Sequence, residues 1–167
     1  PGLQRQHLAC VRAAADVSGG EALGAELGST TVELRPGGVG ARPGTYRFAV
    51  GSAGSTLLVL QSVLAPLCVA SGTTELELEG GTHNPLAPPF DFITRSFLPL
   101  VARMGARAEL RLVRHGFAPA GGGRVTARIE PAGAPRPLEL LERGEARPPR
   151  VEITLANLPG DIGAREW

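Results

Sequence analysis

The sequence predicts an α/β fold, in which amphipathic helices pack on a sheet of short strands. Two observations support this class. Helix-like and strand-like segments follow one another along the chain, and turns rich in glycine or proline separate them. The 167 residues are 43% hydrophobic and 20% charged, which is typical of a globular domain with an apolar core.

The first part of the chain predicts a helix followed by a strand. Residues 3–18 carry apolar side chains at helical spacing, and Gly19-Gly20 ends the helix. These apolar positions include Leu3, Leu8, Val11 and Ala15. Residues 31–34 alternate in polarity as a strand does, and the glycine- and proline-rich residues 35–44 form a loop.

The central part predicts a strand, a turn, a helix and a second strand. Residues 45–50 form the first strand, the Gly/Ser-rich residues 51–55 the turn, and residues 56–70 a largely buried helix. Residues 73–81 alternate most clearly, so leucines face one side of the sheet and glutamates the other. The leucines are Leu76 and Leu78, and the glutamates are Glu75, Glu77 and Glu79.

The following part predicts a loop, a helix and two strands. Residues 82–90 contain three prolines and form the loop. Asp91 is the expected N-cap of a helix that runs to Met104. The side chains expected to face inward are Phe92, Ile93, Phe97, Leu100 and Val101. Residues 108–113 and 124–130 alternate as strands.

This order of elements predicts a repeated α/β unit. Residues 3–35 show a helix, a glycine stop and strands, as does the last part of residues 45–130. We therefore expect the end of a first unit at 1–44 and a complete second unit at 45–136. Residues 137–167 are expected to form new strands at the start of an inserted domain.

Charge and cysteine content exclude several function classes. The net charge is +1, with 17 basic and 16 acidic residues, so no strong field favours non-specific binding of polyanions. All the basic residues are arginines, which excludes a lysine nucleophile. Two cysteines and three histidines at wide spacing make no metal motif. With no visible signal peptide and no apolar run long enough for a bilayer, the expected location is cytoplasmic.

The glycine-rich stretches each allow a structural and a functional interpretation. "HGFAPAGGGRV" (115–125) is either a strand connection with a bulge or a backbone that lies tight against a ligand or a neighbouring strand. "GSAGS" (51–55) precedes a helix and is a candidate phosphate site, although it lacks the lysine and spacing of a Walker loop.

Single polar residues leave the same choice open. Gln61 lies in an apolar helix and is either satisfied by backbone or contacts a ligand. Hydrogen-bond donors gather on a first helical turn at Arg5, Gln6 and His7. They either bind an anion, which the helix dipole favours, or face only solvent. None of the three histidines has an acid partner that the sequence reveals, so a catalytic triad is not supported.

Four blocks in order resemble the RNA 3′-terminal phosphate cyclase family. They are "PGLQRQHL", "YRFAVGSAGSTLLVLQ", "GGTHNPLAPPFDFI" and the stretch His-Gly-x-x-Pro-x-Gly-Gly-Gly-x-Val at 115–125. The resemblance implies ATP-dependent conversion of an RNA 3′-terminal phosphate into a 2′,3′-cyclic phosphate. A histidine is first adenylated, AMP passes to the RNA phosphate, and the 2′-OH displaces it. ATP and a divalent ion, Mg²⁺ or Mn²⁺, are the implied cofactors, and RNA 3′-phosphate ends are the implied partners.

The resemblance also implies site residues. Gln61, Pro88 and Pro89 match ATP-contacting positions, and Arg5, Gln6 and His7 match positions near the phosphates. Residues 46–48 fall in a block near the nucleotide. The adenylated histidine of the family belongs to a C-terminal segment absent from this sequence, so no catalytic residue is assigned here. We therefore expect a fragment that is inactive alone.

The implied family fold consists of repeated units of two helices on a four-stranded sheet, with a smaller domain inserted before the last unit. Three other functions remain open. They are a cyclase-like protein of ribosomal RNA processing without cyclase activity, a transferase of a related repeat fold such as the enolpyruvyl-transferase group, and an interaction module without a site.

Overall fold

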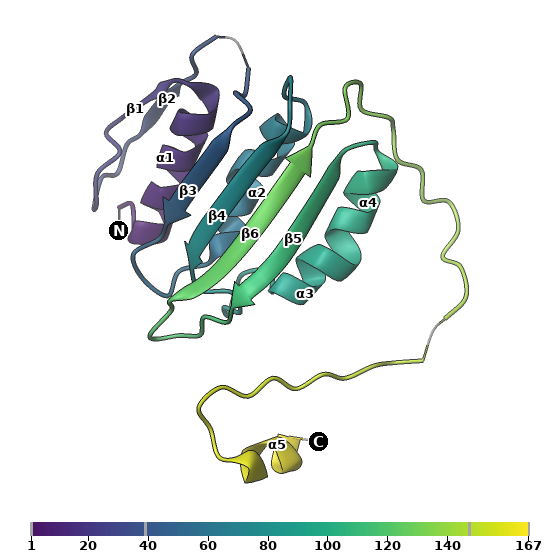
Figure 1. Ribbon diagram of the computed structural model, residues 1–167. Coiled ribbons are helices and arrows are strands. Elements are labelled where there is room, and N and C mark those ends of the chain that lie inside the picture. Colours follow the sequence, from purple (N-terminus) through teal and green to yellow (C-terminus); the bar gives the residue numbers. More distant parts are fainter. Residues whose placement is uncertain (1, 39, 147, 167) are drawn as a thin grey trace.

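The computed structural model describes residues 2–38, 40–146 and 148–166, and its centre is a four-stranded mixed sheet (Figure 1). The strand order is β3-β4-β6-β5. The strands are β3 (Thr45–Ala49), β4 (Thr74–Gly80), β5 (Arg107–Arg114) and β6 (Gly123–Glu130). β3 and β4 are parallel, whereas β6 pairs antiparallel with both β4 and β5. The predicted α/β class is confirmed.

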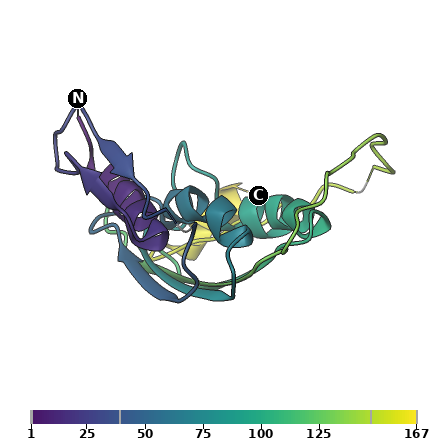
Figure 2. The ribbon, with the colours of Figure 1, turned by 90° about the horizontal axis from the view of Figure 1, so that it is seen from above.

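The helices cover one face of this sheet, as the view from above shows (Figure 2). They are α1 (Arg5–Ser18), α2 (Thr56–Cys68), and a third helix that runs through α3 (Phe90–Phe92), the π-helical turn η1 (Ile93–Phe97) and α4 (Leu98–Arg103). The core lies between helices and sheet, where Leu57, Leu60, Leu78 and Ile129 are fully buried. Two helices on four strands make the unit predicted for residues 45–136, although its boundaries stay a prediction.

The N-terminal part forms a helix and a small two-stranded sheet beside this unit. α1 ends at Gly19, which has φ 59° and whose amide donates to Ala15 and Asp16 carbonyls. β1 (Glu21–Leu23) pairs antiparallel with β2 (Glu33–Arg35). The strand predicted at 31–34 therefore begins two residues later and ends one residue later, where it pairs with β1. α1 packs on α2, so this part adds a third helix to the same layer.

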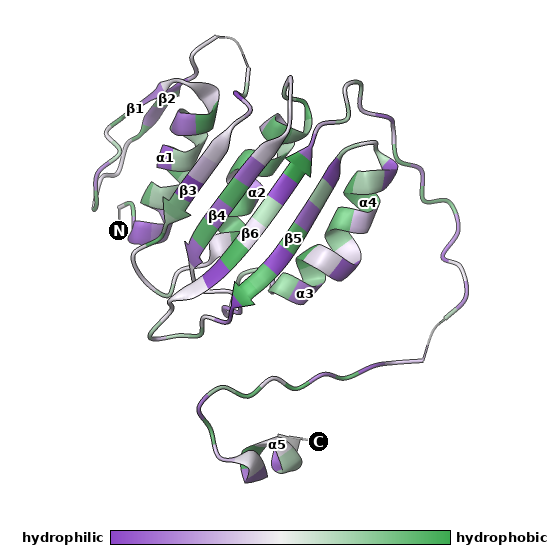
Figure 3. Cartoon of the chain, viewed as in Figure 1, coloured by the Kyte–Doolittle hydropathy of each residue, from purple (hydrophilic) through white to green (hydrophobic). Residues whose placement is uncertain are grey.

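The opposite face of the sheet is charged and open. Along β4, the leucines are buried and the glutamates lie outward, as the alternation predicts, and the same alternation is visible along β5 and β6 (Figure 3). Arginines of neighbouring strands pair with these glutamates: Arg47 with Glu77 at 3.1 Å, and Arg128 with Glu75 at 2.7 Å. The hydrogen bonds that Arg128 donates to Glu130 and to Glu75 raise the pKa of its guanidinium group.

The predicted helix 91–104 is corrected in two respects. Its N-cap is Pro89, not Asp91, which lies in the first turn as a carboxylate near the helix dipole. Phe92 was expected to face inward but is 49% exposed, whereas Leu98 is buried. η1 lies between these two residues, and a π turn adds a residue to the helical repeat, so positions before and after it do not follow one α-helical stripe.

The strands predicted in residues 137–167 are wrong for the part that the structure describes. Residues 138–146 and 148–155 form no paired strand, residues 156–158 bend, and a short helix, α5 (Gly160–Glu166), follows them (Figure 1). Their apolar side chains, such as Leu141 and Val151, are exposed and find no neighbouring strand to pair with. Every helix in the described ranges is too short or too polar to traverse a bilayer.

Candidate functional site

One edge of the sheet collects the loops that carry the sequence motifs. We call it the loop edge and define it by residues 51–55, 81–89 and 115–122. β3, β4 and β5 end there, and α1, α2 and α3 begin there (Figure 1). Three helix N-termini therefore bring positive dipole ends to one side of the molecule, which favours an anionic ligand.

Gln6 joins the start of α1 to the Gly/Ser turn. Its side-chain Oε1 accepts a hydrogen bond from the Ser55 amide at 2.6 Å, and Arg5 donates to the Gly51 carbonyl at 3.4 Å. Gln6 is half-buried, whereas Arg5 and His7 are exposed. His7 Nδ1 accepts the Gln4 amide at 3.2 Å, so part of its ring is used to cap α1.

The amides of residues 54–58, at the end of the GSAGS turn and the start of α2, are used within the protein. The Gly54 amide donates to Ser52 Oγ, and Ser55 Oγ accepts the Leu57 and Leu58 amides. The Thr56 amide donates to the Gly81 carbonyl. With the donors from residue 54 to residue 58 engaged, this turn fits a structural junction better than a phosphate cradle.

The triple glycine packs against the same turn. A Cβ on Gly121, which has φ 68°, would lie 2.8 Å from Ala53 Cα and 2.8 Å from the Ser52 carbonyl oxygen. At the other end of the connection, a Cβ on Gly116 would lie 2.4 Å from the Gly123 amide. The stretch "HGFAPAGGGRV" therefore joins β5 to β6, as the connection interpretation predicts, and its glycines allow backbones to approach closely.

A cavity of about 330 Å³ between α1 and β3 gathers arginines. Arg5, Arg12 and Arg47 line it, with Phe48 and Asp16. The structure thus brings together Arg5 and two members of the block 46–48. Arg12 was not predicted, although its spacing of seven residues from Arg5 places both on one face of a helix.

Gln61 lies elsewhere, in an apolar groove of about 400 Å³ between α2 and α4. Val101, Met104 and Cys68 are among the other lining residues. Within the described residues, the structure gives the half-buried Gln61 amide no hydrogen-bond partner. Burial raises the pKa of the Cys68 thiol, so it is kept as a neutral apolar group in this wall.

The two prolines do not share this groove. Pro88 is half-buried, and Pro89 is exposed beside a separate hollow of about 300 Å³ at the loop edge. Asp91 and Arg95 line the same hollow, and their side chains pair at 3.1 Å. The ATP-contacting positions that the resemblance implies are therefore not brought into a single cavity.

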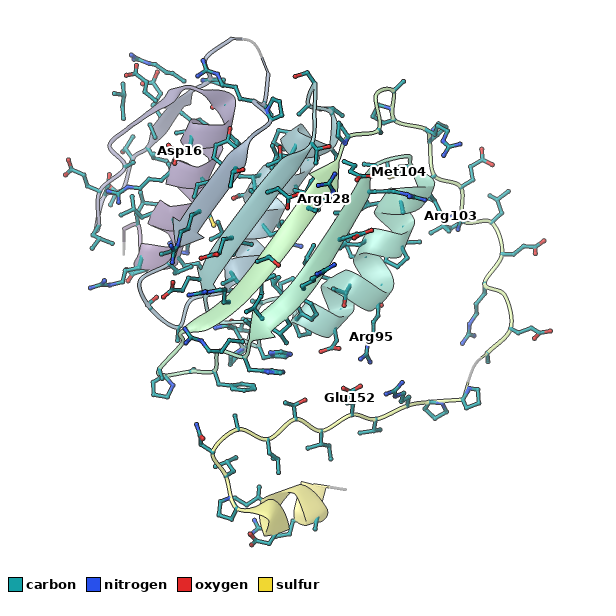
Figure 4. All side chains as sticks on the ribbon, in the orientation of Figure 1. Asp16, Arg95, Arg103, Met104, Arg128 and Glu152 are labelled. Carbon is teal, nitrogen blue, oxygen red and sulfur yellow. The ribbon has the colours of Figure 1, made fainter. Side chains whose placement is uncertain are left out.

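Histidine–carboxylate pairing is a feature that sequence reasoning missed. His83 Nε2 lies 3.4 Å from Asp91 Oδ2, and its Nδ1 lies 2.9 Å from Thr82 Oγ1. Arg95 also reaches Glu152 at 3.1 Å, and the two side chains point toward each other in Figure 4. The separation of eight positions between His83 and Asp91 corresponds to no regular spacing, because a loop determines the distance between the two side chains.

No group of three or more His, Cys, Asp or Glu side chains is placed to hold a metal ion within ranges 2–38, 40–146 and 148–166.

Comparison with known proteins gives one consistent family. The family model described as RNA 3′-terminal phosphate cyclase matches residues 1–158. Proteins named RNA 3′-terminal phosphate cyclase are 50% identical over 166 residues in Salmonella agona, 165 in Koribacter versatilis and 166 in Pseudomonas fluorescens. Each alignment covers 99% of this chain but only 46–48% of the relative, so the chain spans about half the length of these proteins. The chain belongs to the RNA 3′-terminal phosphate cyclase family.

Proposed function

We propose that this chain is part of an enzyme that uses ATP to convert an RNA 3′-terminal phosphate into a 2′,3′-cyclic phosphate. Family membership gives the reaction class. The observation in this structure that supports it best is the cavity lined by Arg5 and Arg12, since guanidinium groups suit phosphates. Arg47 also lines this cavity, but its guanidinium pairs with Glu77 on the open face of the sheet. Arg5 lies at the start of α1, where the helix dipole is positive.

Arg5, Gln6 and His7 are assigned to the phosphate side of the site. The half-buried Gln6 holds α1 against the GSAGS turn, so it positions Arg5 rather than contributing a free amide. Arg5 is exposed, and only a long hydrogen bond of 3.4 Å to Gly51 restrains its side chain. Its guanidinium therefore keeps donors for phosphate oxygens, and its charge stabilises the negative charge that gathers there.

Gln61, Pro88 and Pro89 are assigned to the nucleotide. The groove at Gln61 fits a flat heterocycle, because its walls are apolar and one half-buried amide has no partner among the described residues. A base there gains dispersion contacts from Val101 and Met104 and can exchange hydrogen bonds with Gln61. Pro88 and Pro89 belong to the stiff loop that leads into α3.

The chemical logic is activation of a leaving group. A phosphate monoester is a poor electrophile until AMP caps it, after which the neighbouring 2′-OH can close the ring and release AMP. In the proposal, the histidine that carries AMP lies in the part of the relatives that this chain does not cover. ATP acts with a divalent ion, for which the described residues offer no set of three ligands.

Two free cysteines agree with a reducing, cytoplasmic location.

The second candidate is a cyclase-like protein of ribosomal RNA processing that shares the fold but forms no adenylate. Intact-mass spectrometry of the complete protein after incubation with ATP and magnesium separates the two. The cyclase proposal predicts a covalent AMP on the complete protein and none on the 167-residue chain. A folded complete protein without added mass would support the second candidate.

Arg5→Ala in the complete protein tests the phosphate assignment. Loss of one charged hydrogen-bond donor is expected to lower RNA cyclisation about tenfold or more. Arg107→Ala, at the exposed start of β5, is the matched control and is expected to leave the rate unchanged. Equal rates for both variants would contradict the assignment of Arg5.

A further inference from the structure

Arg12 lines the same cavity as Arg5 but belongs to neither the phosphate side nor the nucleotide side of the proposed site. Its side chain is exposed, and no ion pair among the described residues includes it. The arginines of the open face differ, since Arg47, Arg124 and Arg128 each pair with a glutamate. Arg12 therefore keeps its charge and its guanidinium donors for a ligand.

The face of α1 that lines the cavity alternates between charged and apolar positions. In chain order, these positions are Arg5, Leu8, Ala9, Arg12 and Asp16. Seven positions separate the two arginines, which at 1.5 Å per residue is about 10.5 Å along the helix axis. A nucleic-acid strand alternates in the same way, because a ribose with apolar carbon atoms lies between successive phosphates. The two arginines and the apolar side chains between them therefore suit two phosphates of one strand.

The remaining wall of the cavity favours RNA over a free phosphate ion. Phe48 and Val50 are buried there and offer an apolar surface to a sugar. Asp16, one turn beyond Arg12, carries a carboxylate that only accepts hydrogen bonds, so it repels a phosphate but suits a hydroxyl donor. Each ribose of RNA provides such a donor in its 2′-OH.

The nucleotide side of the proposed site is remote from this cavity. Neither Gln61 nor the prolines of residues 88–89 line it. Gln61 lies in the groove between α2 and α4, whereas α1 lies on the other side of α2 (Figure 1). A triphosphate that extends from there along the loop edge meets Arg5 at the start of α1, and Arg12 lies two turns further from that edge. The anion at Arg12 is therefore expected to belong to the RNA.

We infer that Arg12 binds an internucleotide phosphate of the RNA strand, on the 5′ side of the 3′-phosphate. This inference rests on the proposed function, because it presumes an RNA substrate. It deepens that function by giving the strand a direction: the 3′ end lies at the loop edge near Arg5, and the preceding nucleotides follow α1 away from that edge. Since phosphates carry no sequence information, the contact is expected to serve all RNA sequences equally.

The test uses the complete protein and a single-stranded RNA oligonucleotide with a 3′-phosphate, labelled at its 5′ end for fluorescence anisotropy. Arg12→Ala removes the charge, whereas Arg12→Lys retains it without the planar guanidinium. Arg107→Ala, at the exposed start of β5, is the matched control. Binding is measured over a series of salt concentrations, and thermal melting of each variant verifies that it is folded.

Arg12→Ala is expected to weaken RNA binding about tenfold at low salt, the loss for one charged hydrogen bond. It is also expected to reduce the slope of the logarithm of affinity against the logarithm of salt concentration by about 0.7, the value for one phosphate of a single strand. Arg12→Lys and Arg107→Ala are expected to retain the wild-type slope. An unchanged slope for Arg12→Ala would overturn the inference.

A neutral linkage identifies the phosphate that Arg12 contacts. Methylphosphonate replaces one internucleotide phosphate at a time in otherwise identical oligonucleotides. At one linkage, the wild type is expected to lose about tenfold in affinity, and Arg12→Ala is expected to lose nothing further. If Arg12→Ala loses as much as the wild type at every linkage, Arg12 contacts none of these phosphates and the inference fails.

Covalent AMP formation in the absence of RNA separates this inference from the proposed function. Adduct formation, and the cyclisation rate at saturating RNA, are expected to be equal in the wild type and Arg12→Ala. Slower adduct formation would assign Arg12 to ATP, and slower cyclisation at saturation would assign it to the terminal phosphate, so either result overturns the inference. If the wild type forms no adduct at all, the proposed function fails, whereas the salt slope still decides whether Arg12 contacts RNA.

Discussion

At the residue scale, two glutamines on helices have opposite roles. Gln6 is half-buried and its side chain accepts the Ser55 amide, so it contributes to stability. Gln61 is equally half-buried but finds no hydrogen-bond partner within the described residues, so its amide is available for a ligand. The sequence shows two polar residues in helices and does not distinguish them, because the difference lies in what the opposing loop offers.

Gln6→Ala is expected to destabilise the protein by about 1–2 kcal/mol, because the Ser55 amide loses its acceptor in a partly buried site. Urea unfolding of the complete protein, followed through the transition of this unit, measures the change. Glu26→Ala, an exposed residue of the N-terminal part, serves as the control. An unchanged midpoint for Gln6→Ala would show that water replaces the glutamine without cost.

Gln61→Ala is expected to weaken ATP binding about five- to tenfold, the loss for one neutral hydrogen bond, while the melting temperature without ATP stays nearly the same. Calorimetric titration of the complete protein with ATP measures the affinity. Ser62→Ala, on the next position of α2, is the control. A large loss of stability with unchanged ATP affinity would show that Gln61 has only a structural role.

At the element scale, the connection between β5 and β6 is built around close backbone contacts. Gly121 and Gly122 have nearly the same dihedral, φ 68° and φ 69°. Their surroundings differ: a Cβ on Gly121 would meet the GSAGS backbone at 2.8 Å, whereas one on Gly122 would meet only the Arg114 side chain at 3.9 Å. This pair separates the cost of positive φ from the cost of a clash.

Gly122→Ala is expected to destabilise the protein by about 1 kcal/mol, the cost of a left-handed conformation for alanine. Gly121→Ala is expected to cost more than this, because the two turns must also move apart. Unfolding midpoints of the two variants give the comparison directly. Equal losses would mean that the GSAGS turn gives way without cost and that only backbone strain matters.

At the scale of the whole molecule, helices cover one face of the sheet (Figure 2), and ion pairs lie on the other. Arg47, Arg124 and Arg128 alternate with glutamates across β3, β4 and β6. Since opposite charges balance there, this face offers no field for RNA, in contrast to the start of α1, where the exposed Arg5 reaches Gly51 of the loop edge. The RNA is therefore expected at the loop edge rather than on the open face.

Glu77→Gln tests the ion pairs of the open face. Glu77 lies 3.1 Å from Arg47 and 3.8 Å from Arg124, and its loss is expected to destabilise the protein by at most about 1 kcal/mol. The effect is expected to shrink in high salt, because the pairs are partly exposed. Glu142→Gln, on the extended segment, is the control, and a salt-independent loss at Glu77 would contradict an electrostatic origin.

Much of the fold follows from local patterns. The alternation in residues 73–81 gives β4, and the glycine stop at Gly19 gives the end of α1. The π turn η1 was not predictable, since no residue type marks it and only packing reveals the shifted stripe. The strands expected after residue 137 fail because alternation defines a strand only when a partner strand lies beside it.

The candidate site was predictable in its residues but not in their grouping. The family resemblance identifies Arg5, Gln6 and Gln61 as site residues. The fold, however, places Gln61 in a separate groove between α2 and α4. The cluster of His83, His115 and Phe117 was missed because its members come from two loops that are about 30 residues apart in sequence and meet only when β4 and β5 end at the same edge.

The most direct test of the central claim is the fate of an RNA 3′-phosphate. The complete protein is incubated with ATP, magnesium and a short 3′-phosphorylated RNA, and the oligonucleotide is weighed by mass spectrometry. Cyclisation is predicted to remove the mass of one water from the RNA, only with ATP, and not from an oligonucleotide whose terminal 2′-OH is replaced by hydrogen. An unchanged RNA mass with folded protein and ATP present would contradict the claim.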